Sequence, residues 1–291
     1  MSEMLGSLVE SIERRFIDAD LYFGHGSFEA FDEAAYAVLH TVGLPLETLD
    51  DHWERAVTGE EVARVELLVN ARIASRKPIA YLTQEAWLGP HRFYVDERVL
   101  VPRSFIAELL HEELSPWVQD PQKVSRVLDL CTGSGCLAIL AALAFPNAKV
   151  DAADLSRDAL DVAKRNLAEY GLQDRVRLIE SDMFAALEGQ RYDLILTNPP
   201  YVTGEPMRAL PEEYRREPAM ALASGEDGLD HTRTILAEAR EHLTDQGLLV
   251  VEVGFNREGV EHAFPSLPVT WLEVSAGDEV VFLVEAGNLH A

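Results

Sequence analysis

The chain has 291 residues, enough for one large domain and a smaller one with a full hydrophobic core. Its formal net charge is −25, from 25 Lys and Arg against 50 Asp and Glu. This acidity argues against direct binding of nucleic acid, because Lys and Arg contacts with phosphates supply most of that affinity, and it favours a basic partner. The two cysteines, Cys131 and Cys136, are too few for a disulfide scaffold or a zinc site, so we predict no metal.

The chain carries no sign of a targeting or membrane segment. Its N-terminus lacks a basic region followed by an apolar core, and no uninterrupted apolar run reaches the length of a membrane span. We therefore predict a cytoplasmic protein without membrane association.

Residues 1–80 predict a small helical domain. Apolar side chains recur at helical spacing in three segments, 1–21, 29–43 and 59–76. His25 lies between two glycines in the loop after the first segment, and it is interpreted either as a substrate contact or as a structural residue. Residues 81–104 change character, because aromatic and β-branched side chains surround a Gly-Pro pair, and they predict a β-hairpin that links two domains.

Residues 105–291 predict an α/β domain. A helix at 105–114 is followed by strands that alternate with helices, which is typical of a parallel sheet covered on both faces. The last two strands are separated by a short Ala-Gly-Asp turn, so we expect them to pair as an antiparallel hairpin at the sheet edge. The predicted strands are 124–130, 149–154, 176–180, 192–197, 248–253, 270–274 and 280–284, and the main helices are 136–145, 158–170 and 232–243.

The most informative stretch is 194–201, Leu-Ile-Leu-Thr-Asn-Pro-Pro-Tyr, a strand that runs into a rigid corner. Pro199 and Pro200 fix the backbone and donate no N–H, and Asn198 adds a side-chain acceptor. The oxygens of Asn198 and Pro199 can receive the two hydrogens of a planar NH₂ group while Tyr201 packs on its face. Such a corner suits methylation of a poorly nucleophilic amide or amino nitrogen, although an Asn-Pro turn that merely closes a strand is also common.

Three other strand ends predict a cofactor site. The first strand runs into Asp-Leu-Cys-Thr-Gly-Ser-Gly at 129–135, a glycine turn that lets a ligand approach a helix N-terminus. Asp154 ends the second strand and could bond ribose hydroxyls, and Asp182 and Met183 after the third could contact an adenine. Carboxyl ends of parallel strands share one sheet edge, so a nucleoside would lie beside Asn198. S-adenosylmethionine has the ribose, adenine and transferable methyl group that this arrangement requires.

The residues at 129–135, Asp154, Asp182 and 198–201 resemble class I S-adenosylmethionine methyltransferases and, more narrowly, the protein glutamine N(5)-methyltransferase family. The resemblance covers nearly the whole chain. It implies a Rossmann-like seven-strand mixed sheet over 105–291, a helical substrate-docking domain over 1–80 and a linking hairpin over 81–104.

Two branches of this family differ in their substrate. The branch that methylates the Gly-Gly-Gln glutamine of release factors usually continues its Ile-Pro-Arg motif as Pro-Asp-Thr-Glu, whereas here residues 101–103 continue as Ser-Phe-Ile. The segments 23–26, 31–34 and 93–104 resemble the branch that methylates a glutamine of ribosomal protein L-3. That target is strongly basic and suits a chain of net charge −25, since opposite charges raise the association rate.

The resemblance also implies roles for individual residues. The glutamine is held by the corner at 198–201 and by Pro102 and Arg103, and transfer is direct, with no dedicated base beside the corner. The family commonly has a larger aromatic ring where Met183 stands. The cofactor residues carried over are Asp129, Cys131, Thr132, Gly133, Gly135, Asp154, Asp182, Met183 and Asn198.

Two alternatives come from other classes. Adenine amino methyltransferases hold an NH₂ group with the same four-residue corner, but they call for a basic face and an insertion that extrudes the base. A catalytically silent binding module is expected to have other residues in the glycine turn or in place of Asn198, and both motifs are intact here.

Overall fold

The computed structural model describes residues 3–27 and 29–289. The chain divides into two compact units. The helical unit comprises 1–86 together with 210–217, and the sheet unit comprises 87–209 together with 218–291. The short segment 210–217 therefore belongs to the helical unit although it follows the Asn-Pro-Pro-Tyr corner in sequence.

The helical unit contains the three predicted helices and further short ones. Its core joins α1, α2 and α4 through residues such as Ile12, Phe16, Val38 and Val65. Helix α4 begins with a reciprocal capping box, in which the Thr58 side chain accepts from the Glu61 backbone and Glu61 accepts from Thr58 N–H. The helices are α1 (Leu5–Asp18), α2 (Ala30–Val42), η1 (Leu46–Thr48), α3 (Leu49–His52), α4 (Gly59–Ser75) and α5 (Ile79–Thr83).

A cluster of buried charges lies inside the helical unit. Arg72 is fully buried, and its Nε donates to Glu33 Oε1 at 2.7 Å. Glu213, from segment 210–217, is also fully buried and lies 2.8 Å from Arg76 Nε and 3.6 Å from Arg72 Nη1. Burial raises the pKa of Glu33, and the adjacent Arg72 opposes that rise. The segment is thus held by pairing of opposite charges that are removed from water.

His25 also contacts segment 210–217. Its Nε2 lies 3.3 Å from Glu217 Oε2, and both side chains are buried. The Tyr214 ring lies 4.3 Å from the His25 ring, centroid to centroid. Of the two interpretations of His25, the structure therefore favours the structural one.

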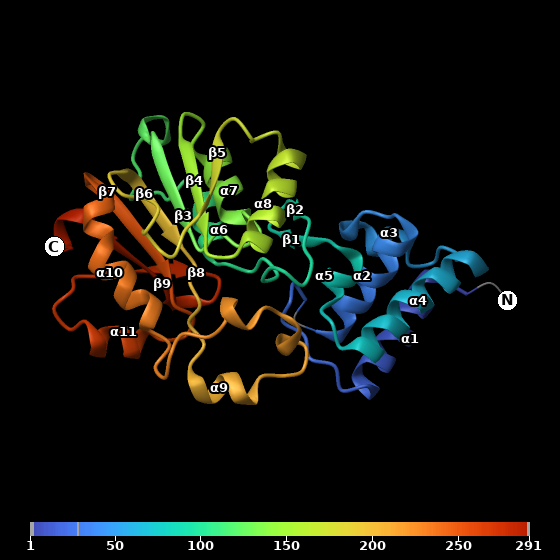
Figure 1. Ribbon diagram of the computed structural model, residues 1–291. Helices are drawn as coiled ribbons and strands as arrows, with labels where there is room; N and C mark the ends of the chain where they lie inside the picture. The colour runs from blue at the N-terminus through green and yellow to red at the C-terminus, as the bar shows by residue number, and fades with distance from the viewer. Residues whose placement is uncertain (1–2, 28, 290–291) are drawn as a thin grey trace. The chain divides into compact units, whose positions relative to one another are not determined.

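The sheet unit is built on seven strands in the order β5-β4-β3-β6-β7-β9-β8 (Figure 1). The first five are parallel to one another, and β9 is antiparallel to both β7 and β8. This confirms the predicted seven-strand mixed sheet with an antiparallel hairpin at its edge. The strands are β3 (Arg126–Leu130), β4 (Lys149–Asp154), β5 (Val176–Glu180), β6 (Tyr192–Thr197), β7 (Leu243–Glu252), β8 (Thr270–Val274) and β9 (Gly277–Glu285).

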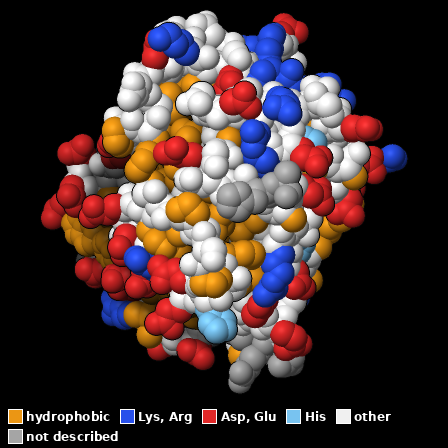
Figure 2. Space-filling view, turned by 90° about the vertical axis from the view of Figure 1, so that its left-hand side faces the viewer, with side chains coloured by type: hydrophobic (Ala, Val, Ile, Leu, Met, Phe, Trp, Pro, Cys, Tyr) orange, Lys and Arg blue, Asp and Glu red, His pale blue; other side chains and the backbone are white. Residues whose placement is uncertain are grey.

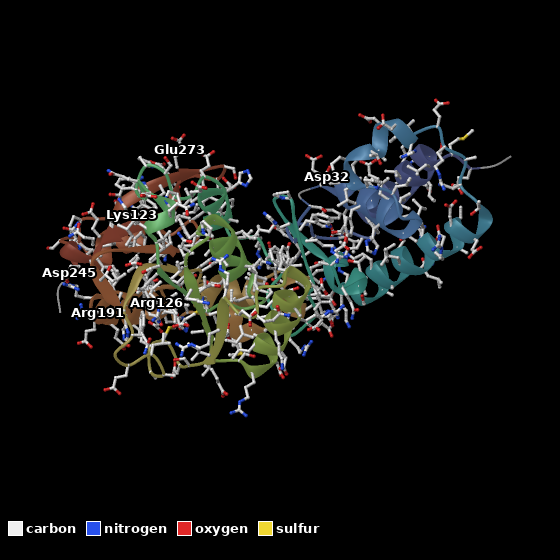
Figure 3. The ribbon with its side chains drawn as sticks, turned by 90° about the horizontal axis from the view of Figure 1, so that it is seen from above. Asp32, Lys123, Arg126, Arg191, Asp245 and Glu273 are labelled. Carbon is white, nitrogen blue, oxygen red and sulfur yellow. The ribbon has the colours of Figure 1, made fainter. Side chains whose placement is uncertain are left out.

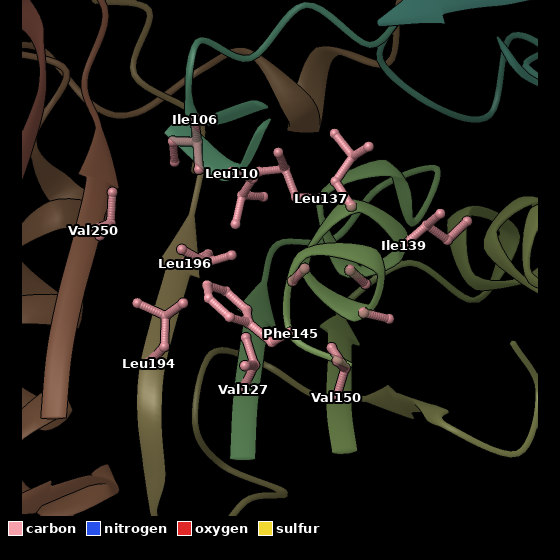
Figure 4. Packing of buried hydrophobic residues seen from close by; sticks show 14 of the residues in the cluster. Ile106, Leu110, Val127, Leu137, Ile139, Phe145, Val150, Leu194, Leu196 and Val250 are labelled. Carbon is pink, nitrogen blue, oxygen red and sulfur yellow. The ribbon is translucent and has the colours of Figure 1, made fainter. Parts of the chain in front are cut away.

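Helices cover both faces of this sheet. One face packs its apolar side chains against α6 and α7, where Leu196 and Val250 meet Ile106, Leu137 and neighbouring residues (Figure 4). The other face packs against α10 and α11. The remaining elements are α6 (Ile106–His111), α7 (Cys136–Ala144), α8 (Arg157–Tyr170), α9 (Gly204–Ala209), α10 (Asp230–His242), α11 (Arg257–Ala263), the hairpin β1 (Ala86–Leu88) and β2 (His91–Phe93), and four 3₁₀ turns, η2 (Pro121–Lys123), η3 (Tyr214–Arg216), η4 (Ala219–Ala221) and η5 (Ala286–Asn288).

Several predicted elements differ from the observed ones by a few residues at one or both ends, and two of these differences have a structural reason. The helix predicted over 105–114 ends at His111, because Glu113 and Leu114 have positive φ values and cannot continue a right-handed helix. The strand predicted to begin at 248 begins at Leu243 instead. The polar run that follows Leu243 resembles a turn in sequence, but Leu243 pairs with Tyr192 before a register shift.

Charged residues gather at the amino-terminal edge of the sheet. Asp151 is buried and accepts from Arg126, Arg177 and the Tyr192 hydroxyl at 2.8 to 3.0 Å. At this edge Arg126 is the first residue of β3, and Arg191 directly precedes β6 (Figure 3). On the face drawn in Figure 2, acidic side chains are spread widely while Lys and Arg form separate groups.

Among the described residues, no helix combines the length and apolarity that crossing a membrane requires.

Candidate active site

All the predicted site residues except Pro102 and Arg103 lie at the carboxyl edge of the sheet. Strand order reverses between β3 and β6, since β3 leads outward to β4 and β5 while β6 leads to β7. The glycine turn follows β3, Asp154 ends β4, Asp182 follows β5 and Asn198 follows β6. A crevice outside such a reversal is where ligands bind in open α/β sheets.

The glycine turn is shaped by residues of unusual backbone conformation. Cys131, Gly133 and Gly135 have φ values of 63°, 55° and 79°. A Cβ on Gly135 would lie 3.0 Å from the Cβ of Ala163, so glycine there lets α8 approach the turn closely. This approach brings the start of α7 and the middle of α8 together.

Asp129 is fully buried beneath the turn. Its Oδ2 accepts from Thr132 Oγ1 and from the backbone N–H of Ala138. Burial raises the pKa of Asp129 to about 7, against the lowering effect of these two donors. Its Oδ1 has no hydrogen-bond partner among the described residues. An unpaired acceptor below a glycine turn fits a ligand that carries a donor, as the amino group of S-adenosylmethionine does.

Asp154 helps to build the same turn. Its Oδ2 accepts from Gly133 N–H and its Oδ1 from Ser156 N–H, both at 2.8 Å. Each carboxylate oxygen can accept more than one hydrogen bond, so the predicted ribose contact is compatible with these bonds. The next residue, Leu155, is 55% exposed and offers apolar surface at the edge. We did not predict it, although an apolar residue directly after a strand-terminal acid was a readable signal.

Asp182 and Met183 lie in a turn after β5. Asp182 is exposed, while Met183 is half-buried against one apolar cluster and has a φ of 46°. The turn is closed by Ser181, which donates to Met183 O at 2.7 Å and accepts from Ala186 N–H at 3.0 Å. Ser181 thus closes the turn that carries both predicted adenine contacts, and it was missed by the sequence analysis.

The Asn-Pro-Pro-Tyr corner is anchored on both sides. Before it, the buried Thr197 hydroxyl donates to Leu130 O at 2.8 Å and joins the ends of β6 and β3. After it, the Tyr201 ring packs on Gly254, where a Cβ would lie 2.7 Å from Tyr201 Cε2. Gly228 similarly allows close approach to Tyr201 O, which a Cβ would meet at 2.4 Å. These two glycines were not singled out by sequence.

Asn198 keeps its side-chain amide unpaired. It is half-buried, and its amide makes no hydrogen bond within residues 3–27 and 29–289. Pro199 is buried and Pro200 half-buried, so the corner is held without help from the Asn198 side chain. The amide oxygen is therefore available to a ligand donor.

Pro102 and Arg103 lie just before α6. Pro102 is buried, and Arg103 is half-buried with Nη1 donating to Val101 O at 3.3 Å.

Cys131 and Cys136 form no disulfide bond. Burial raises the pKa of each thiol, that of Cys136 to about 12. The described residues hold no cluster of three or more His, Cys, Asp or Glu suited to a metal ion.

Comparison with known proteins gives consistent answers. Residues 107–227 match the family model described as methyltransferase small domain. The chain is 55% identical over 291 residues to the ribosomal protein uL3 glutamine methyltransferase of Burkholderia pseudomallei, covering 98% of this chain and 95% of that protein. It is 52% identical over 288 residues to the protein of the same name from Bordetella pertussis, covering 99% and 97%. The chain belongs to the ribosomal protein uL3 glutamine methyltransferase family.

Solved structures agree at the level of the fold. A methyltransferase from Pyrococcus furiosus aligns with a TM-score of 0.50 at 19% identity, covering 75% of this chain and 97% of that one. The hMettl16 catalytic domain aligns with a TM-score of 0.50 at 13% identity, covering 78% and 81%. These structures bear out the predicted fold. The relatives at 52–55% identity confirm the predicted family and methyltransferase class, and membership of this family supports S-adenosylmethionine as the methyl donor.

Proposed function

We propose that the chain transfers a methyl group from S-adenosylmethionine to the side-chain amide nitrogen of one glutamine in ribosomal protein L-3 (uL3). The observation that carries this proposal is the unpaired Asn198 amide in a rigid corner, next to the glycine turn at the reversal of strand order. The names of the relatives, at 52–55% identity over nearly the whole chain, support the same target.

The cofactor residues are proposed as a set. The turn at 129–135 would receive the amino-acid end of S-adenosylmethionine, with Asp129 Oδ1 as an acceptor. Asp154 would bond the ribose, while Leu155 and Met183 would flank the adenine and Asp182 would accept from its amino group. When bound, S-adenosylmethionine supplies an electrophilic methyl group on a sulfonium.

The chain itself contributes position rather than a base. The Asn198 side-chain oxygen and the Pro199 carbonyl would accept the two N–H hydrogens of the glutamine amide, while Tyr201 covers its face. An amide lone pair is delocalised, so fixed acceptors that orient it and draw on its N–H bonds lower the barrier to transfer. The proton would leave to water.

The charge of the chain supports a basic protein substrate. At a net charge of −25 the chain attracts a basic protein at long range, which raises the association rate more than the final affinity. Such a substrate places the enzyme in the cytoplasm. The release-factor glutamine and an adenine amino group are the competing substrates for the same corner.

The test offers methyl-labelled S-adenosylmethionine with purified uL3, with purified release factor and with ribosomal RNA. We expect label on uL3 alone, located by mass spectrometry at a single glutamine side chain. The same assay is run with Asn198→Ala, which should label uL3 far more slowly. Its control is Asn147→Ala, which removes an exposed amide near the amino-terminal edge of the sheet and should label uL3 normally. Label on the release factor alone would overturn the choice of target, and label on RNA would overturn the amide assignment.

A further inference from the structure

The segment 94–105 joins β2 to α6 without regular secondary structure, yet two buried polar side chains hold its ends. One of them, Asn166, lies on α8, and the other, Glu252, ends β7. The segment includes Pro102 and Arg103, the predicted substrate contacts. Neither Asn166 nor Glu252 has a part in the transfer described above.

Asn166 holds the first end. It is fully buried, and its Oδ1 accepts from Tyr94 N–H at 2.7 Å while its Nδ2 donates to Tyr94 O at 3.0 Å. The same Nδ2 donates to Ser134 O in the glycine turn at 2.9 Å. One side chain thus satisfies both backbone groups of Tyr94 and a carbonyl of the turn. Because Ala163, one helical turn earlier, packs on Gly135, α8 contacts the glycine turn at two points.

Tyr94 is further oriented by its own side chain. The Arg165 guanidinium lies 3.4 Å from the centre of the Tyr94 ring, and the Tyr94 hydroxyl donates to Asp96 Oδ2 at 2.7 Å. Asp96 also accepts from Arg98, which holds the pKa of Asp96 at about 2. These contacts keep the first part of the segment in one conformation.

Glu252 holds the second end. It is 1% exposed, and its Oε2 accepts from Ser104 Oγ at 2.6 Å and from Phe105 N–H at 2.9 Å. Thr197 pairs with Val251 in the parallel ladder, so Glu252 lies one residue further toward the carboxyl edge, beside Asn198. The clamp on Ser104 and the unpaired amide of Asn198 therefore stand on neighbouring strand ends.

We propose that Asn166 and Glu252 are positioning residues that hold segment 94–105 as one wall of the glutamine site, and that Asn166 also ties this wall to the cofactor turn. This inference rests on the proposed glutamine methylation. Polar groups that stay buried must be hydrogen-bonded, and here the bonds are made to an irregular segment and to the turn rather than to a helix or sheet ladder. The arrangement preorganises two parts of the site at once.

Two pairs of variants separate positioning from general stability. Glu252→Ala removes the clamp, whereas Glu252→Gln keeps a side-chain oxygen that can accept from Phe105 N–H. Asn166→Ala removes all three bonds, whereas Asn166→Asp keeps the acceptor for Tyr94 N–H. Asp151→Asn is the matched control, because Asp151 is a buried strand carboxylate with side-chain partners near the opposite edge.

Three readouts are needed: kcat and KM with uL3, the Kd of S-adenosylhomocysteine by calorimetry, and hydrogen exchange at 94–105. We expect Glu252→Ala to lower kcat/KM about tenfold or more with an unchanged Kd, and Glu252→Gln to recover most of that loss. Asn166→Ala should weaken S-adenosylhomocysteine about tenfold and also lower kcat/KM. Both alanine variants should speed exchange at 94–105, and Asp151→Asn should change none of the three readouts.

The proposal is overturned if the folded alanine variants exchange at 94–105 as slowly as the wild type, or if Asp151→Asn reproduces their kinetics. If Glu252→Ala fails to fold, the Glu252→Gln variant and a Ser104→Ala variant test the same clamp by exchange at 104–105. Exchange and cofactor-product binding need no protein substrate. A wild-type enzyme that leaves uL3 unmethylated would therefore refute the proposed function while these two readouts still decide the clamp.

Discussion

The helical unit and the carboxyl edge of the sheet unit bury carboxylates in opposite ways. In the helical unit, Glu33 and Glu213 lie against Arg72 and Arg76, so the buried charges largely neutralise one another. At the carboxyl edge of the sheet unit, Asp129 and Glu252 accept from hydroxyls and backbone N–H groups. Burial raises the pKa of each of these two to about 7.

This difference distinguishes the structural cluster of charges in the helical unit from the carboxylates of the proposed site. In the helical unit, pairing with Arg72 and Arg76 holds Glu213 and its segment 210–217, although the second carboxylate oxygen of Glu213 has no hydrogen-bond partner among the described residues. Carboxylates bonded to neutral donors instead shape the loops that bear the predicted site, and Asp129 retains an unpaired oxygen. Burial is therefore common to both groups, and what differs is the partner: an arginine in the helical unit, and a hydroxyl or backbone N–H at the carboxyl edge.

Removal of Arg72 is the strongest test of the structural cluster. Arg72→Met leaves Glu33 buried without its charged partner, and we expect a loss of about 3–5 kcal/mol in the stability of the helical unit. Hydrogen exchange in α2 and α4 measures this, and exchange in β3 and β6 should not change. Arg14→Met, which removes an exposed pair with Glu10, is the control and should cost less than about 1 kcal/mol. Similar costs for the two variants would break the comparison.

Removal of the Asn198 amide tests the functional edge. We expect Asn198→Ala to lower kcat about 100- to 1000-fold, as found when one preorganised hydrogen-bonding group is removed from an active site. Binding of S-adenosylhomocysteine, measured by calorimetry, should remain close to the wild-type value. Near-normal turnover would refute the role of the amide as an acceptor.

The pH dependence of the free energy of unfolding tests whether Glu252, which is bonded to neutral donors, behaves differently from a carboxylate paired with arginine. Its pKa is raised from 4.5 to about 7 by burial, while Ser104, Phe105, Ile106 and the nearby Arg103 oppose the rise. Between these pH values the native state holds a proton that the unfolded state has released, so this group's stabilisation is present below pH 4.5 and is lost as pH rises toward 7. The total effect is on the order of 3 kcal/mol.

Urea denaturation from pH 4 to pH 8 measures this effect. The stability of wild type relative to Glu252→Gln should fall over that window. Ser104→Ala should extend the fall to higher pH, because the hydroxyl favours the ionised carboxyl. A constant difference between wild type and Glu252→Gln would show that Glu252 does not titrate in this range.

The smallest expected effect concerns the cap of α4. Thr58→Ala removes one half of the capping box and should cost about 1 kcal/mol in the helical unit, measured by denaturation. The rate of methyl transfer should not change, because this cap contacts neither the buried charges around Arg72 nor the proposed active site. A lower rate would mean that local stability of the helical unit matters for catalysis.

Much of the sheet unit was readable from the sequence. Strands β4, β5, β6 and β8 have the predicted bounds, because each is a short apolar run closed by polar or turn-forming residues. The segments that were missed are short or weakly patterned, such as α9 and α11, or resemble turns, such as the first residues of β7. The predicted cofactor residues and the Asn-Pro-Pro-Tyr corner lie at the ends of well-patterned strands, which is why they could be named in advance, whereas Pro102 and Arg103 were named from the family resemblance alone.

Ser181, Gly228 and Gly254 were missed because their roles depend on neighbours that are distant in sequence or on a turn conformation. A glycine shows its purpose only when the Tyr201 ring is seen against it.

The sequence by itself determined the class of fold, the glycine turn and the Asn-Pro-Pro-Tyr corner, since periodicity and proline geometry are local properties of the chain. Only the tertiary structure decided that segment 210–217 belongs to the helical unit and that Asn166 and Glu252 clamp the segment 94–105. These contacts join residues 72 and 147 positions apart, and no local pattern encodes which buried polar group will meet which backbone. Pairing at such distances is set by the packing of whole elements, which brings the two groups together only after the chain has folded.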